Sequence, residues 1–202
     1  MYTPKPFELT DTSEAVAFMQ RYSFGTLITV IDGEPVATHL PFVIKQDGNQ
    51  VILSSHLARP NVQSQHLLNS TSLVVFTEPH AYIAPKHYEK ELNVPTWNYI
   101  AVHAYGKATI VTDEREQLAA LEEMIASYDN DYLKQWATLP ADYKQKMAKG
   151  IVGFNITVTS LQGKKKLSQN RTDIDRQSVI QALESSADAH EQVIGSYMRS
   201  EL

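Results

Sequence analysis

The 202-residue chain contains no cysteine. This absence excludes disulfides, thiolate nucleophiles and cysteine-based zinc or iron–sulfur sites. The eight glycines do not cluster, and the chain has neither the Gly-x-Gly-x-x-Gly dinucleotide loop nor the Gly-x-x-x-x-Gly-Lys phosphate loop. A Gly-x-Ser-x-Gly nucleophile elbow is missing as well. If the protein binds a phosphate group, side chains must therefore make many of the contacts to it.

Long apolar runs and an excess of positive charge are also missing. No stretch approaches the roughly 20 apolar residues that a membrane helix needs, and residues 1–7 lack the basic start and apolar run of a secretory signal. We therefore expect a cytoplasmic protein. The chain carries 18 basic and 23 acidic residues, a net charge of −5. Because DNA-binding domains usually present a basic stripe, this balance argues against strong direct DNA binding.

Strand-like segments separated by short turns dominate the chain, with helical patterns mainly in its second half. Few helices come between the strands, which favours an antiparallel barrel over βαβ units. Asp32-Gly33 and Asp47-Gly48 are strong turn signals between strands. The predicted strands are 26–31, 35–44, 50–55, 72–76, 81–83, 98–111 and 150–161, and the predicted helices are 11–22, 60–68, 113–128, 140–149 and parts of 173–200.

Four sequence runs are unusual for an ordinary core. Residues 95–106 read Pro-Thr-Trp-Asn-Tyr-Ile-Ala-Val-His-Ala-Tyr-Gly, so polar aromatic side chains alternate with small or aliphatic ones. The others are His-Leu-Pro-Phe at 39–42, His-Leu-Ala-Arg-Pro-Asn at 56–61 and Lys-Leu-Ser-Gln-Asn-Arg at 166–171. Together these runs resemble the PaiB family, bacterial relatives of the flavin-binding split β-barrels that are generally described as FMN-binding negative transcriptional regulators. The resemblance extends from residue 1 to about residue 180.

The resemblance implies a mainly β fold with α-helices, an antiparallel split β-barrel of the FMN-binding type. In this interpretation residues 1–202 form a single domain, with a helical excursion at 113–149 and a helical tail at 173–202. FMN is the implied cofactor. A homodimer is expected, because split barrels leave strand edges that are normally covered.

Several side-chain donors lie where a predicted strand ends and a predicted helix begins. Hydroxyl, imidazole and guanidinium donors at such a junction favour an anion, since the helix N-terminus adds free amides. In flavin split barrels the residues after the equivalent strand commonly hold the FMN phosphate, so the resemblance favours a phosphate site over a simple capped turn. The residues are Ser54, Ser55, His56, Arg59 and Asn61.

Two further segments are assigned to the flavin ring. In related barrels the backbone of the strand that contains His39, Leu40 and Pro41 lies against the ring. Pro41 lacks an amide proton, which suits either an edge strand or a strand facing a ligand. Trp97 suits the wall of a flavin pocket, and the alternative is an outer barrel face covered by helices or by a second subunit.

Polar side chains are concentrated in the run at 166–171. Taken alone, the run is equally typical of a solvated charged loop with an Asx-type cap. Its amides and cation can also engage pyrimidine edges and phosphate oxygens. The resemblance assigns Lys166, Ser168, Gln169 and Asn170 to the cofactor site, in the same chain or in a partner subunit.

The implied function is an FMN-binding negative transcriptional regulator that works through a flavin-dependent state or a regulatory protein partner. One alternative is an FMN-dependent oxidoreductase similar to pyridoxamine-phosphate oxidase, but no positioned acid, base or substrate clamp emerges, so no catalytic residue is predicted. A haem-binding split barrel with one axial histidine is the other alternative. The histidine spacing gives no zinc motif, and no metal site is predicted.

Overall fold

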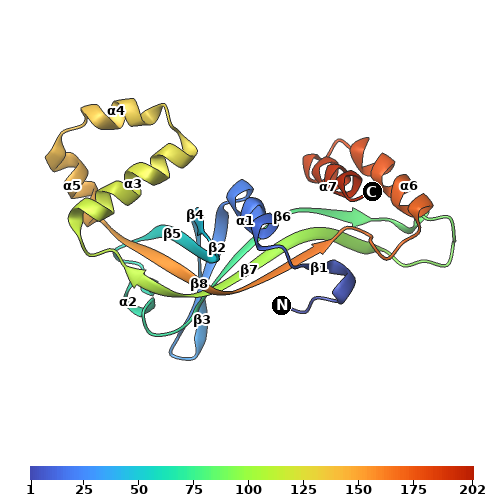
Figure 1. Ribbon diagram of the computed structural model, residues 1–202, viewed down its shortest axis with the longest axis horizontal. Helices are drawn as coiled ribbons and strands as arrows, with labels where there is room; N and C mark the ends of the chain where they lie inside the picture. Colours follow the sequence, from blue (N-terminus) through green and yellow to red (C-terminus); the bar gives the residue numbers. More distant parts are fainter. The chain divides into compact units, whose positions relative to one another are not determined.

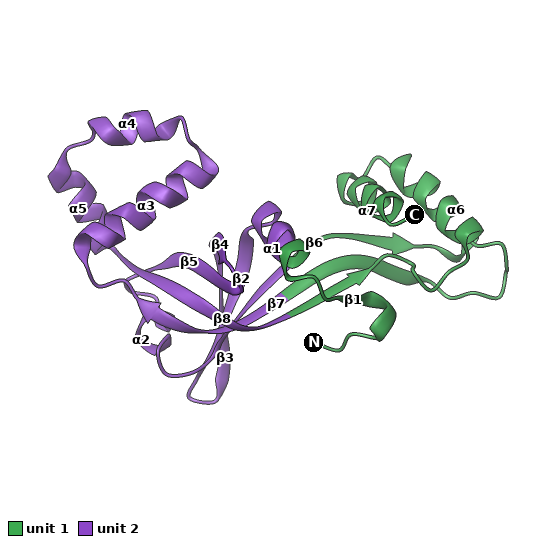
Figure 2. Ribbon diagram, viewed as in Figure 1, with its two compact units in different colours: residues 1–15, 77–102, 162–202 green, residues 16–76, 103–161 purple.

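A computed structural model describes residues 1–202, which form two compact units (Figure 2). Unit 1 comprises residues 1–15, 77–102 and 162–202, and unit 2 comprises residues 16–76 and 103–161. Three long strands contribute residues to both units. No helix is long and apolar enough to cross a membrane.

Eight strands and seven α-helices make up the chain (Figure 1). The helices are α1 (Thr12–Arg21), α2 (Gln63–His66), α3 (Glu114–Tyr128), α4 (Tyr132–Thr138), α5 (Ala141–Lys149), α6 (Asp173–Glu184) and α7 (Ala189–Ser200). The strands are β1 (Glu8–Leu9), β2 (Phe24–Ile31), β3 (Glu34–Pro41), β4 (Val43–Asp47), β5 (Gln50–Ala58), β6 (Ser72–Ile83), β7 (Thr96–Ile110) and β8 (Ile151–Lys166). Two short 3₁₀ turns, η1 (Lys5–Phe7) and η2 (Pro85–His87), complete the list.

The strands form one sheet in the order β3-β2-β6-β7-β8-β5-β4, with β1 pairing β8 beside this path. The pairings of β2 with β3 and with β6, of β4 with β5 and of β5 with β8 are all antiparallel. The two end strands, β3 and β4, do not pair with each other, so the sheet stays open. An antiparallel, split barrel was predicted, and this topology agrees with it.

Turn chemistry explains the β2–β3 hairpin. Asp32 and Gly33 both have positive φ, 52° and 86°. This is the conformation that a two-residue type I′ turn needs, and its twist matches that of the flanking strands. The hairpin register follows, with Ile31 opposite Glu34 and Phe24 opposite Pro41.

The core of unit 2 is built from alternate residues of the strands. Val51, Leu53 and Leu57 of β5 are buried while the residues between them are more exposed, as expected for a strand with one face inward. Phe42 packs edge-on against Phe76 and Phe154, with ring centroids 5.6 and 6.4 Å away. These contacts fix the inner face of unit 2.

Helices α6 and α7 provide much of the core of unit 1. Thr172 and Asp188 cap their N-termini through side-chain oxygens that accept backbone amide hydrogens. Buried residues of the two helices include Val179, Ile180 and Ile194. Met198 of α7 contacts the buried Asn98 of β7, so this helix covers the inward face of that strand.

The predicted elements differ from the structure in several places, among them β1, which was not predicted, and β8, which extends beyond the predicted end at residue 161 to Lys166. The strand predicted at 35–44 is two strands, because β3 pairs with β2 as far as Pro41 and β4 pairs with β5 from Val43 onward. The helix predicted at 60–68 shrinks to α2. The two strands predicted within 72–83 are the continuous β6, and α4 was not predicted.

Candidate functional site

The donors predicted to hold a phosphate in unit 2 do not sit at a helix N-terminus. Ser54, Ser55 and His56 lie inside β5, and α2 begins only at Gln63 and spans four residues. The prediction that these side chains enter a helix is therefore wrong. The strand continues to Ala58 because it pairs with β8 as far as Ile151.

The two serines of β5 already have protein partners. The Ser54 hydroxyl donates to Oδ1 of Asn155 at 2.7 Å, and the Ser55 hydroxyl donates to the carbonyl of Pro41 at 2.7 Å. The first bond ties β5 to β8, and the second ties β5 to the end of β3. Both hydroxyls thus hold strands together in this arrangement.

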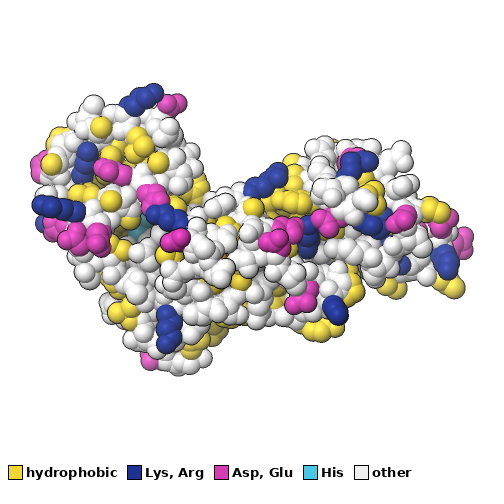
Figure 3. All heavy atoms as spheres, viewed as in Figure 1, with side chains coloured by type: hydrophobic (Ala, Val, Ile, Leu, Met, Phe, Trp, Pro, Cys, Tyr) yellow, Lys and Arg dark blue, Asp and Glu magenta, His cyan; other side chains and the backbone are white.

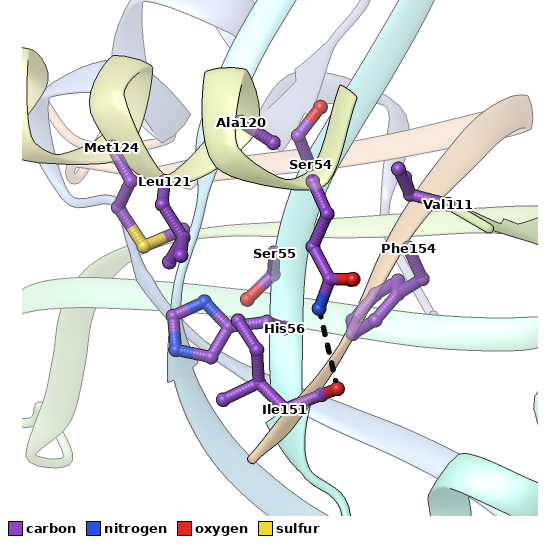
Figure 4. Close-up of a pocket in the computed structure, with 11 residues that line it drawn as sticks. Ser54, Ser55, His56, Val111, Ala120, Leu121, Met124, Ile151 and Phe154 are labelled. Atoms are coloured by element: carbon purple, nitrogen blue, oxygen red, sulfur yellow. Dashed lines mark hydrogen bonds between the residues drawn. The ribbon is translucent and has the colours of Figure 1, made fainter. Parts of the chain in front are cut away.

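His56 lies in a pocket beneath α3 (Figure 4). Leu121 and Met124 of α3 line the pocket together with Ile151 and Phe154 of β8, so the surroundings of the imidazole are largely apolar. Burial lowers the pKa of His56 below its usual value, since desolvation disfavours the charged form. A neutral histidine under a helix is a poor partner for a phosphate.

Arg59 and Asn61 hold the turn between β5 and α2. The guanidinium of Arg59 donates to the carbonyls of Lys149 and Ile151, at 2.7 and 2.8 Å. The Asn61 side chain donates to Oγ1 of Thr38 at 3.0 Å and accepts the amide hydrogen of Gln63 at 2.9 Å. These bonds account for most of the donors that were predicted to be available.

His39, Leu40 and Pro41 lie at the end of β3, which is an edge strand in the sheet order. The edge position of this proline-containing strand was one of the two predicted alternatives. Leu40 is buried, whereas His39 is exposed and stacks on Phe24 with ring centroids 6.5 Å apart. The role of these residues toward a flavin stays a prediction.

The run at 166–171 in unit 1 forms a tightly bonded loop after β8. Ser168 is 3% exposed and has a φ of 63°, a conformation that residues other than glycine rarely adopt. Its hydroxyl pairs with the amide of Asn98, which is fully buried: Nδ2 of Asn98 donates at 2.9 Å. Gln169 accepts the amide hydrogen of Leu167 and donates to the carbonyl of Lys165. Ser168 and Gln169 therefore shape the loop.

Three cations lie in or just before this loop. They are Lys164, Lys166 and Arg171, and we call them the cation cluster. None of them forms a salt bridge, whereas Lys165, between the first two, pairs with Glu14 and Glu201. Burial, followed by the charges of Lys164 and Arg171, lowers the pKa of Lys166. The cluster thus concentrates positive charge that no carboxylate contacts directly.

Uncharged groups hold the members of the cation cluster in place. The ammonium of Lys166 donates to Oγ1 of Thr96 and, at 2.8 Å, to the carbonyl of Trp97. Lys164 lies 5.2 Å from the ring centroid of Tyr99, and Arg171 lies 4.2 Å from that of Tyr88. Cation–π contacts of this kind stabilise the cations without neutralising them.

Trp97 belongs to a group of rings that we call the aromatic platform, together with His80 and Tyr82 of β6. The ring centroid of Trp97 is 5.8 Å from that of His80 and 5.7 Å from that of Tyr82. The indole is 51% exposed and the Tyr82 side chain 45%. Nδ1 of the neighbouring His190 is buried without a hydrogen-bond partner.

The structure thus divides the predicted site residues between the units. It brings Trp97 and Lys166 together in unit 1, with the loop that contains Ser168, Gln169 and the exposed Asn170. The predicted site residues from His39 to Asn61 lie in unit 2. The sequence prediction missed Asn98, Tyr82, His80 and Lys164 as site residues, although alternation along β7 already separated the faces of Trp97 and Asn98.

Residues 1–160 match the family described as "Putative FMN-binding domain". The chain belongs to this FMN-binding family. It is 39% identical over 208 aligned residues to the "Protease synthase and sporulation protein PAI 2" of Bacillus subtilis (strain 168), and the alignment covers 100% of this chain and 98% of that protein. The predicted resemblance to the PaiB family is confirmed.

Solved structures show the fold of this FMN-binding family member independently. The flavocytochrome Anf3 from Azotobacter vinelandii superposes with a TM-score of 0.63 at 14% identity, covering 79% of this chain and 69% of that one. A FAD and heme binding protein from Mycobacterium smegmatis gives a TM-score of 0.62 at 12% identity, covering 79% and 73%. The chain is an FMN-binding split-barrel protein.

The chemistry of FMN fits the donors of unit 1. FMN combines a planar aromatic ring system with a phosphate, and it therefore needs an aromatic surface and cations in reach of each other. The aromatic platform and the cation cluster supply these two, and Lys166 joins them by donating to the backbone carbonyl of Trp97. In unit 2, by contrast, the serines, Arg59 and Asn61 are bonded to the protein itself.

Proposed function

We propose that this protein is an FMN-binding negative transcriptional regulator of the PaiB type that holds the FMN phosphate with the cation cluster. One observation carries the cofactor site: Lys164, Lys166 and Arg171 form no salt bridge, and Lys166 contacts the carbonyl of the exposed Trp97. Unbalanced, partly desolvated cations attract an anion more strongly than cations in open water. A phosphate is the anion that FMN offers.

The residues of the loop have distinct tasks in this proposal. Lys166, Lys164 and Arg171 bind the phosphate oxygens, and Asn170, the exposed amide, adds a donor. Ser168 and Gln169 keep the loop in its conformation through their bonds within unit 1. A bound flavin would supply one- or two-electron redox chemistry, and the protein would supply binding and orientation.

The regulatory part of the proposal rests on the family and on the charge of the chain. A full-length relative is named a protease synthase and sporulation protein. Because the net charge is −5, a protein partner explains regulation better than direct contact with DNA. On the visible face of the molecule, basic and acidic side chains are interspersed over α3–α5 and form no stripe of one sign (Figure 3).

A homodimer completes the proposed function. The end strands β3 and β4 leave backbone groups unpaired, and such edges are normally covered in native proteins. Phe24 and Val30 of β2 are 66% and 52% exposed, which adds apolar surface that a second copy would bury. Light scattering is expected to give twice the chain mass of 22.7 kDa, and a monomer with and without FMN would contradict the dimer.

Titration calorimetry with FMN and riboflavin tests the phosphate site. Lys166→Ala is expected to weaken FMN binding by about 1.5–3 kcal/mol, the usual loss for a hydrogen bond to a charged group. Riboflavin lacks the phosphate, so its affinity should not change. Lys134→Ala is the matched control, because the Lys134 side chain is 85% exposed and lies in unit 2. Equal affinities of the unmodified protein for the two ligands would refute the phosphate assignment.

A further inference from the structure

We infer that the aromatic platform receives the isoalloxazine ring of FMN, in unit 1 and beside Lys166 of the cation cluster. This inference rests on the proposed FMN binding and adds the position of the ring. It assigns a ligand to Tyr82 and His80 as well as to Trp97. It also implies that ring and phosphate are held by separable sets of side chains.

The alternation of β6 and β7 places the platform on one face. In β6 the side chains of His80 and Tyr82 are exposed, whereas Ala81 and Ile83, one residue away from them, are buried. In β7 Trp97 is exposed beside the buried Asn98. Successive side chains of a strand point to opposite faces, so the three rings lie opposite the buried Ala81, Ile83 and Asn98. The His80 ring also reaches His190 at the start of α7, with ring centroids 5.2 Å apart.

The lysines of the cation cluster belong to the same face of the sheet. Tyr99 follows Trp97 by two residues and therefore shares its face. Lys164 of β8 contacts the Tyr99 ring at 5.2 Å, which places its ammonium on the same side. The sheet order β6-β7-β8 then puts the rings on two adjacent strands and the lysines on the third.

The chemistry of the face matches a flavin better than a plain apolar ligand. Indole offers the strongest aromatic π face among the side chains, and the half-exposed indole of Trp97 is supported by His80, inclined at 51°, and by Tyr82, inclined at 69°. The ring system of a flavin is planar and also has a polar edge with carbonyl and nitrogen groups.

A crossed titration separates the two halves of the site. Binding of FMN and of riboflavin would be followed by quenching of flavin fluorescence in the unmodified protein, Trp97→Ala and Lys166→Ala. Trp97→Ala is expected to lower the affinities for FMN and for riboflavin by the same factor, roughly tenfold, because both ligands contain the ring. Lys166→Ala is expected to weaken FMN alone.

Trp136→Phe serves as the matched control, since Trp136 is the other tryptophan of the chain and is buried in unit 2. It should leave both affinities unchanged. Tyr82→Ala is a second platform variant with the same expected pattern as Trp97→Ala, and circular dichroism checks that each variant folds.

Each outcome of the titration decides one part of the inference. Equal weakening of both ligands in the platform variants supports the ring position. Unchanged affinities in folded Trp97→Ala and Tyr82→Ala would overturn the ring position and leave FMN binding intact. Weakening of FMN without riboflavin in these variants would also overturn it, because the rings would then act on the phosphate end. If the unmodified protein binds neither flavin, the proposed function itself fails.

Discussion

Ser168 provides a test of how the loop beside the cation cluster is held. Its side chain is 3% exposed and bonds the fully buried amide of Asn98, while its backbone has a φ of 63°. These two features have opposite consequences for substitution. The hydroxyl stabilises the native loop, whereas the Cβ atom destabilises it at this φ.

Comparing Ser168→Ala with Ser168→Gly separates the two contributions. Alanine keeps the Cβ atom and leaves the amide of Asn98 with only the weak acceptor Sδ of Met198, at 3.3 Å. An unsatisfied buried donor costs about 1–3 kcal/mol, so we expect Ser168→Ala to lose about 2 kcal/mol of the free energy of unfolding. Glycine loses the same bond and relieves about 1 kcal/mol of left-handed strain, for a net loss of about 1 kcal/mol.

Urea unfolding of the three proteins measures these differences as shifts of the midpoint at constant slope. In thermal unfolding the alanine variant should lose about 4–8 °C, since 1 kcal/mol shifts the midpoint by about 2–4 °C for a chain of this size. The unmodified protein should be the most stable of the three, followed by Ser168→Gly and then by Ser168→Ala. If the alanine variant equals or exceeds the glycine variant in stability, the left-handed loop conformation is refuted. If neither variant is less stable than the unmodified protein, the bond to Asn98 contributes nothing.

Further predictions concern pH and packing. Because burial lowers the pKa of His56, the unfolded state binds more protons near that pKa; stability should be complete above the ordinary histidine value and fall as pH drops through the lowered one. His56→Gln should flatten this part of a pH–stability curve, and an unchanged slope would show that another group causes it. The lowered pKa of Lys166 predicts that FMN affinity declines with rising pH earlier than an ordinary lysine would cause, and the decline should disappear in Lys166→Ala. Gly106→Ala should cost about 3 kcal/mol, since the new Cβ atom would lie 2.3 Å from the carbonyl oxygen of Thr157; a stability equal to that of the unmodified protein would rule out this close approach of β7 and β8.

Local patterns predicted most of the secondary structure. The turn at Asp32-Gly33 and the cap of α1 by Asp11 depend on neighbouring residues, and both are present in the structure. The break at Phe42 was not predictable, because it depends on a change of pairing partner from β2 to β5 and on packing against Phe76 and Phe154. Distant partners of this kind leave no periodic signal in the sequence.

The candidate site was predictable only as a set of residue types. Lys166 and Trp97 were singled out by their runs and by the family resemblance, and the structure brings them into contact. The serines of β5 were expected to be available donors, but Ser55 bonds the carbonyl of Pro41, 14 residues away. Asn98 was missed because its partner Ser168 lies 70 residues further along the chain. A sequence shows which donors exist, and only the fold shows which of them are already used.

The three consecutive lysines at the end of β8 depend on strand register. The pleat directs Lys165 to the carboxylates of Glu14 and Glu201, while Lys164 and Lys166 lie on the other face of the strand without counterions. Two pairs, Glu8 with Lys164 and Leu9 with Gly163, align β1 with this end of β8. If the register of β8 slipped by one residue, the three lysines would exchange faces. Lys164 and Lys166 would then compete for Glu14 and Glu201, and only Lys165 would lie on the face without carboxylates. The register of β8 therefore decides which of the three lysines has carboxylate partners and which two have none.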